Sequence, residues 1–107
     1  MKKYICTLTQ TGTGAPVATV AEDTLTKYPA YSNMEWVRVS VGHYAMKDPA
    51  EAQSFPPGTT IFTPNSESAH TVRILQDDPL ARNIYTYVNG QLTDGLLYNH
   101  PVMILVP

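Results

Sequence analysis

The chain has 107 residues and a formal net charge of −2, with seven Lys and Arg residues against nine Asp and Glu residues. This length predicts a single domain over residues 1–107, because either half alone would be too small to form a core without metals or disulfides. The cations are scattered along the sequence, so a basic face that could bind nucleic acid is not expected.

The composition indicates short strands joined by turns. Charged residues make up 15%, whereas proline, glycine and tyrosine are frequent, and β-branched and aromatic side chains favour strands. No apolar run approaches the ~20 residues of a membrane-spanning helix. The apolar stretch after Lys2 and Lys3 is too short for a signal peptide, so we expect neither a membrane partner nor a secretion signal.

In chain order, the first strand is expected at residues 4–9 and the second from residue 15 or 16 to 21, joined by a glycine-containing turn. The chain has a single cysteine, Cys6, which excludes an internal disulfide and fits synthesis in the reducing cytoplasm. We interpret Cys6 as a small buried hydrophobe. Residues 22–33 show no sustained period and predict a loop.

Residues 34–41 predict a strand whose alternate side chains form two different faces. These faces are Val37, Val39 and Val41 on one side, and Trp36, Arg38 and Ser40 on the other. We expect the valine face to pack in the core. Gly42 predicts a bend or tight hairpin before the next strand, at residues 43–46.

The sequence Asp48-Pro49-Ala50-Glu51 predicts the start of a helix, because Asp caps helices and Pro suits the first helical position. Pro56 and the residues beside it limit this helix to little more than one turn. Later strands are expected at residues 59–63, 70–75, 84–88 and 102–106, with Asn89-Gly90 as a two-residue turn.

The strand at residues 102–106 is apolar at every position, so both of its faces must be covered. It is either central in a sheet or covered by a partner, and Pro101 and Pro107 limit pairing at its ends. Taken together, the segments predict an all-β fold. We expect a small antiparallel β-sandwich or partly open barrel of about seven or eight strands with one short helical turn.

No catalytic residue, cofactor-binding residue or metal ligand is predicted, and we expect no cofactor and no enzymatic activity. The Gly12-Thr13-Gly14 turn precedes a strand rather than the helix that a phosphate loop requires. The three histidines lack the spacing of a zinc site. Asp77-Asp78 and Asp94 are interpreted as turn or capping residues, and no serine lies in a nucleophile elbow.

Four residues are candidates for contact with a partner: Tyr28 and Tyr31 in the predicted loop, and Val102 and Ile104 in the last strand. Exposed tyrosines stack on sugars and anchor protein partners. The alternative for Tyr28 and Tyr31 is a loop folded back onto the sandwich. For the last strand, the alternatives are a core position and an interface with a larger assembly.

The N-terminal half resembles a known group of proteins. The stretch Thr9-Gln10-Thr11-Gly12-Thr13-Gly14-Ala15-Pro16-Val17-Ala18, the strand Trp36-Val37-Arg38 and the segment Gly42-His43-Tyr44 carry the resemblance. They are similar to small β-rich proteins encoded by Bacteroidota and their tailed phages, including crAss-like gut phages. The resemblance covers residues 1–46 and the last strand, and it implies a virion-associated or surface structural role without catalytic residues.

The expected function is therefore that of a phage structural protein, either a capsid-decorating or head-associated protein or part of an appendage. Its partners would be other virion proteins, with a homo-oligomer as an open possibility. It would be made in the host cytoplasm and incorporated into the virion. The alternative is a carbohydrate- or receptor-binding module that uses the loop of Tyr28 and Tyr31. An enzyme is ranked last, because no convergent acid, base or nucleophile is visible.

Overall fold

The structure is a computed structural model that describes residues 2–25, 27–64, 70–75 and 79–107. The described residues form short strands and one 3-10 turn. These elements are β1 (Lys2–Thr9), β2 (Val17–Asp23), η1 (Pro29–Tyr31), β3 (Glu35–Ser40), β4 (His43–Lys47), β5 (Thr60–Phe62), β6 (His70–Leu75), β7 (Ala81–Val88), β8 (Gln91–Leu92) and β9 (His100–Val106).

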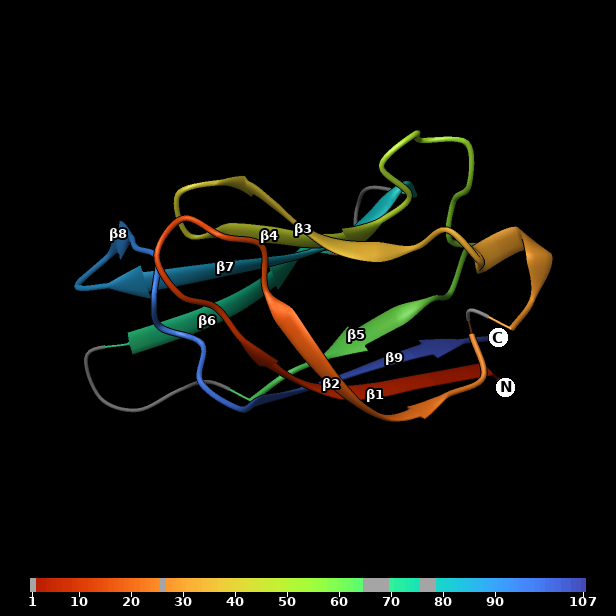
Figure 1. Cartoon of the computed structure of the whole chain (residues 1–107), viewed down its shortest axis with the longest axis horizontal. Coiled ribbons are helices and arrows are strands. Elements are labelled where there is room, and N and C mark those ends of the chain that lie inside the picture. Colours follow the sequence, from red (N-terminus) through yellow and green to blue (C-terminus); the bar gives the residue numbers. More distant parts are fainter. Residues whose placement is uncertain (1, 26, 65–69, 76–78) are drawn as a thin grey trace.

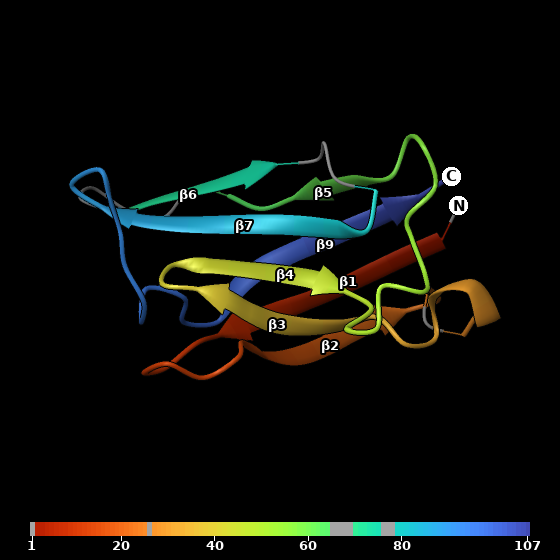
Figure 2. The same cartoon turned by 90° about the horizontal axis from the view of Figure 1, so that it is seen from above.

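The strands form two antiparallel sheets. Sheet A has the order β2-β1-β9-β5, and sheet B has the order β3-β4-β7-β6, with β8 also paired to β7. Figure 1 shows sheet B above sheet A, and Figure 2 shows the same strands from above. The predicted all-β sandwich is confirmed, and the two sheets do not close into a barrel.

The core lies between the two sheets and follows the alternation of side chains along β1 and β9. On β1, Tyr4, Cys6 and Leu8 are buried. Tyr4 lies opposite Ile104 and Cys6 lies opposite Val102, so both strands present these side chains to sheet B. Sheet B contributes large buried side chains to the same cluster: Trp36, Tyr44, Met46 and Ile84.

β9 is central in sheet A, because it pairs with β1 on one side and with β5 on the other. Of the two alternatives for this apolar strand, the central position in a sheet is therefore confirmed. Its inward side chains are buried, whereas the outward Met103 and Leu105 remain partly exposed. The expectation that both faces are covered holds only for the inner face.

The predicted inward face of β3 is wrong. Trp36 is 8% exposed, whereas Val39 is 51% exposed. Burial of the large indole outweighs burial of the smaller valines, and its Nε1 donates a hydrogen bond to the Tyr4 hydroxyl at 3.2 Å. Arg38 lies on the same side of β3 and remains partly exposed, and its guanidinium pairs with Asp94 at 2.8 Å.

The predicted helix after Asp48 is also absent, although Asp48 does cap a turn. Its carboxylate accepts hydrogen bonds from the backbone N–H groups of Ala50, Ala52 and Gln53. Glu51 then takes a φ of +56°, which ends helical geometry. Its carboxylate contacts Lys47 Nζ at 2.9 Å instead of completing a capping box. The helical turn lies instead at Pro29–Tyr31, inside the predicted loop.

The tight hairpin predicted at Gly42 is confirmed. Gly42 joins β3 to β4 with a φ of +65°. A Cβ at this position would lie 2.7 Å from Thr93 N and 2.8 Å from Thr86 O. Only glycine therefore allows the β3–β4 turn to pack against the end of β7 and the segment after β8.

Candidate functional site

Two of the four predicted contact residues are inaccessible. Val102 and Ile104 are 2% and 0% exposed and belong to the core cluster between the sheets. Almost none of either side chain is accessible to a partner while the domain is folded. The side chains of β9 with exposed surface are Pro101, Met103 and Leu105.

The two predicted tyrosines have different environments. Tyr28 is exposed, and Lys2 Nζ lies 4.6 Å from the centre of its ring. Tyr31 is partly buried against the core and stacks on Phe55, with ring centres 6.5 Å apart. The alternative of a loop folded back onto the sandwich therefore describes Tyr31, whereas the ring of Tyr28 remains available for contact with a partner.

An apolar row crosses the outer face of sheet A. Met103 on β9 lies opposite Ile5 on β1 and opposite Phe62 on β5. Side chains that face each other across antiparallel strands lie on the same side of the sheet. Phe62 is 47% exposed, so the row is open to solvent at the β5 end.

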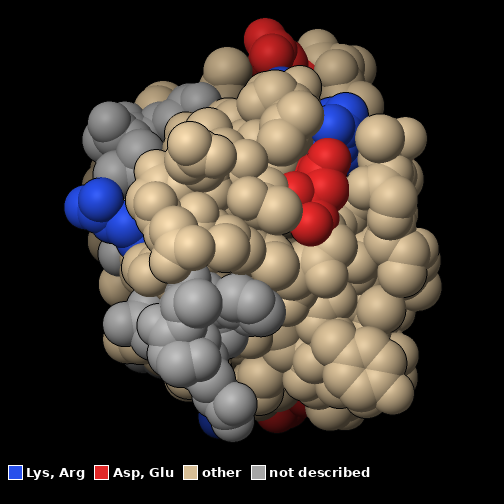
Figure 3. Space-filling view, turned by 90° about the vertical axis from the view of Figure 1, so that its left-hand side faces the viewer, with Lys and Arg blue, Asp and Glu red and all other residues tan. Residues whose placement is uncertain are grey.

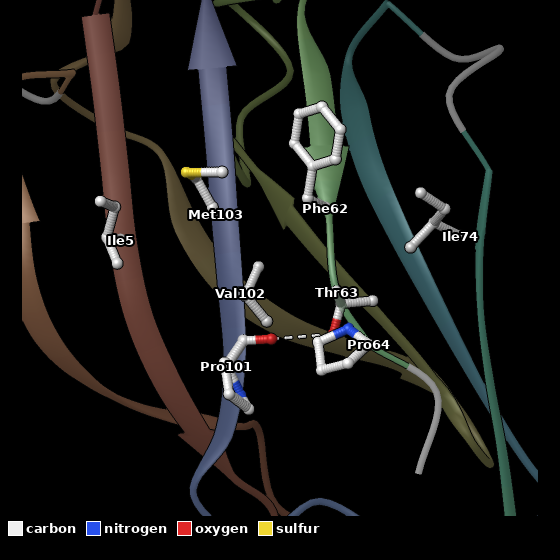
Figure 4. A pocket seen from close by; sticks show the side chains of 8 residues that line it. All are labelled: Ile5, Phe62, Thr63, Pro64, Ile74, Pro101, Val102 and Met103. Atoms are coloured by element: carbon white, nitrogen blue, oxygen red, sulfur yellow. Dashed lines mark hydrogen bonds between the residues drawn. The ribbon is translucent and has the colours of Figure 1, made fainter.

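Beside this row lies a groove of about 360 Å³, which we name the sheet A groove. Its lining residues are Ile5, Phe62, Thr63, Pro64, Ile74, Pro101, Val102 and Met103. Figure 4 shows that these residues come from β1, β9 and β5 with the segment after it, and from β6 at the far side.

The local sequence explains why the groove stays open. β5 contains only three residues and is followed by Thr63 and Pro64. Proline cannot donate to a strand ladder, so pairing with β9 ends there. The Thr63 hydroxyl instead donates to the Pro101 carbonyl at 2.8 Å (Figure 4). The short edge leaves Ile74 of sheet B on the groove wall.

The described lining of the groove is suited to apolar groups. Among the described lining residues, Thr63 alone has a polar side-chain group, and that hydroxyl is already hydrogen-bonded. Contact within this groove would rest on burial of apolar surface.

A polar cluster connects turns at one end of the sandwich. At this end lie the β1–β2, β3–β4 and β7–β8 turns (Figure 1). We name it the turn end. Asp94 accepts hydrogen bonds from Arg38 Nη2 at 2.8 Å, from Gly42 N at 3.0 Å and from the Tyr44 hydroxyl at 2.6 Å. The Arg38 hydrogen bond is the main reason that the pKa of Asp94 is lowered to about 2.

Gln10 extends this cluster to the β1–β2 turn. Its Oε1 accepts a hydrogen bond from Gly95 N at 2.6 Å, and its Nε2 donates to the carbonyls of Gly12 and Gly14 at 2.9 and 3.0 Å. Gln10 is almost fully buried. The amide therefore holds the β1–β2 turn against the segment that carries Asp94.

Four exposed apolar side chains belong to the strands and turns near this polar cluster: Val39, Val41, Leu92 and Tyr98. Figure 3 views the molecule from that end and shows a mostly uncharged surface. The charged pair Arg38 and Asp94 is mutually neutralised. The turn end is thus a second exposed surface with little net charge.

The remaining titratable candidates do not assemble into a reactive site. Burial raises the pKa of Cys6 to about 11, so its thiol stays protonated. His43 stacks on Tyr85 and contacts Asn83 Oδ1 at 2.8 Å, whereas His100 belongs to the other sheet. Among the described residues no group of three metal-ligating side chains occurs. Asp77 and Asp78 lie outside the described residues.

Comparison of the chain with protein-family models, with curated proteins and with solved structures gives no match. Within the described ranges, no helix has the length and apolar character needed to cross a membrane.

Of the residues that line the sheet A groove, only Val102 was predicted from the sequence as a contact residue. Alternation along 102–106 could have divided β9 into two faces, but all five residues are apolar and give no sign of which face is inward. Phe62 and Ile5 belong to strands that are distant in the sequence. Only the pairing of β9 with both β1 and β5 brings them together.

Proposed function

We propose that this chain is a non-enzymatic docking module of a larger protein particle and that it binds through the sheet A groove. The observation that carries the proposal is the apolar groove beside the row of Ile5, Met103 and Phe62. Apolar surface of this kind, open to solvent on a small domain, is typical of a protein interface.

The particle in this proposal is a phage virion, with the chain as a capsid, head or appendage accessory protein. The resemblance of residues 1–46 to virion-associated proteins supports this choice. The low share of charged residues and the short, turn-linked strands also suit a rigid module on a protein lattice. The apolar character of the described lining residues favours a partner that inserts apolar side chains.

Rebinding of the purified chain to virions from the same source tests the proposal. Phe62→Lys should weaken binding at least about tenfold, because it places a charge beside the groove. Leu92→Lys is the matched control, since Leu92 is 41% exposed and lies at the turn end. Equal binding by both variants, or absence of the wild-type chain from purified virions, would reject the docking role.

Carbohydrate binding remains the alternative, and it now depends on Tyr28, because Tyr31 stacks on Phe55. Glycan binding that Tyr28→Ala abolishes and Phe62→Lys leaves intact would favour this alternative over the virion role. Both variants change exposed side chains, so both should fold.

A further inference from the structure

The edge strand β2 has one side that no described strand pairs with. Among the described residues it pairs with β1 alone, and Figure 2 shows it at the outer margin of sheet A with no described strand beyond it. Five of its residues are exposed, among them Val17 and Val20. The sequence Val17-Ala18-Thr19-Val20-Ala21 has no charge and no proline. Such an edge is a template for another strand.

The other edge strands carry features that oppose pairing. β5 has only three residues and is followed shortly by Pro64. β3 contains Glu35 and Arg38 and has an irregular register near Arg38. β6 contains Arg73, which is exposed. Charges, prolines, bulges and short length are the usual means of protecting an edge, and the first four residues of β2 have none of them.

β2 does have one irregularity, and it limits the segment that can pair. Ile5 lies opposite Glu22 and Cys6 lies opposite Val20, so Ala21 is an extra residue in β2. A bulge bends the strand at that point. The two carboxylates of Glu22 and Asp23 therefore follow the bend, and the regular part of the edge is residues 17–20.

A groove of about 440 Å³ lies beside this edge, between β2 and β3. Ala18, Val20, Met34 and Trp36 are among its lining residues. Ala18 and Val20 lie opposite the buried Leu8 and Cys6, so they point to the side of β2 that faces sheet B. A strand added to β2 would place alternate side chains over this groove.

We propose that a second copy of this chain fills this position, with the two β2 strands antiparallel about a two-fold axis at Thr19. In this register Thr19 faces its counterpart, and Ala18 of each copy faces Val20 of the other. Both groove-side pairs are then apolar, and Thr–Thr pairs are favourable across strands. The Glu22 residues of the two copies lie opposite Pro16, about 20 Å apart along the strands, so they do not repel each other strongly.

The second copy fits better than an unrelated peptide because its strand matches the edge on both faces and needs no charged partner. An isologous pair also closes after two copies, which leaves the sheet A groove free in each. The inference is independent of the proposed docking function, since β2 and the sheet A groove share no residue.

Sedimentation and light scattering of the purified chain test the proposal. We expect a dimer with a dissociation constant in roughly the micromolar range. Val20→Lys should raise that constant at least about tenfold, because two ammonium groups then meet near the axis. Val41→Lys is the matched control: Val41 and Val20 are 50% and 48% exposed, but Val41 lies at the turn end. A monomeric wild type, or a dimer that Val20→Lys does not weaken, overturns the proposal.

Amide hydrogen exchange separates strand addition from other modes of dimerisation. In a free edge strand only alternate amides are hydrogen-bonded, whereas a strand paired on both sides protects them all. We expect residues 17–20 to be protected throughout in the wild type and at alternate positions in Val20→Lys. Alternate protection in a wild-type dimer would also overturn the proposal.

Discussion

The Tyr44 hydroxyl lies 2.6 Å from Oδ1 of Asp94, and this contact joins β4 to the segment between β8 and β9. Burial and the neighbouring carboxylate raise the pKa of Tyr44, so the phenol remains a donor. Asp94 also binds Arg38 and the backbone of Gly42. One carboxylate therefore holds the β3–β4 hairpin against a segment that is about fifty residues away in the sequence.

Asp94→Ala is expected to lower the free energy of unfolding by about 1–3 kcal/mol, because Arg38, Gly42 N and Tyr44 would each lose an acceptor. Glu22→Ala is the control, since Glu22 is an exposed carboxylate for which the described residues show no hydrogen bond. Urea unfolding of both variants measures the difference. Equal stability of the two variants would show that the Asp94 cluster contributes little to folding.

Gly42→Ala should destabilise the domain much more than Gly12→Ala. Both glycines have positive φ, at +65° and +59°, so both substitutions carry the backbone cost of about 1–2 kcal/mol. A Cβ at Gly12 meets nothing within 4 Å, whereas one at Gly42 meets two backbone atoms closer than 3 Å. Thermal unfolding should therefore show a clearly larger loss for Gly42→Ala. Similar losses would mean that the β3–β4 turn can move away.

The sequence predicted the strands well where turn residues mark their ends. Gly42 and Asn89-Gly90 form the turns of the β3–β4 and β7–β8 hairpins, and both turns were predicted from local backbone preferences, although β8 was not. The strand at 70–75 has the expected bounds. Turn chemistry acts over a few residues, so a sequence carries it directly.

The faces of the strands were harder to predict because they depend on distant partners. The three alternate valines of residues 37–41 give the stronger apolar pattern, yet Trp36 is the buried residue. The buried indole has Tyr4 as its hydrogen-bond partner, and the partly buried Arg38 has Asp94 as its ion-pair partner. Neither partner can be recognised from the residues around β3.

The helix predicted after Asp48 failed for a local reason that the pattern does not reveal. The cap is present, but Glu51 has a positive φ and its carboxylate binds Lys47. A capping signal indicates where a helix can begin, whereas its continuation depends on competing contacts. The candidate site was missed in the same way, since the groove forms only after β9 has paired with β1 and β5.

Acid should destabilise the domain through His100. Burial lowers its pKa below the ordinary value of 6.5, and its Nε2 has no hydrogen-bond partner among the described residues. The folded state therefore favours the neutral ring. This contribution is complete above the unfolded pKa of 6.5, and it is lost as the pH falls from there through the lower folded pKa.

Unfolding free energies measured between about pH 7 and pH 5 test this expectation. They should fall less steeply for His100→Gln than for the wild type, because Gln does not titrate. His43→Gln serves as the control, since His43 is partly exposed and faces Asn83. Parallel curves for the wild type and His100→Gln would exclude His100 as the cause.

The two faces of β9 should respond differently to a charge. Ile104→Lys places an ammonium group in the core between the sheets, where Ile104 is fully buried and has no acidic partner in the core cluster. Burial of an unpaired charge costs several kcal/mol, so this variant should be unfolded by circular dichroism.

Met103→Lys places the same group on the outer face of sheet A, where the side chain is partly exposed. The flexible lysine stem can cover the apolar row while its charge reaches water, so this variant should fold with a loss of about 1 kcal/mol. It should nevertheless lose binding to virions, because Met103 lines the sheet A groove. Circular dichroism measures the folding of both variants, and a virion-binding assay measures their docking. A folded Met103→Lys that binds as the wild type does would remove the groove from the interface, and a folded Ile104→Lys would contradict the packing of the two sheets.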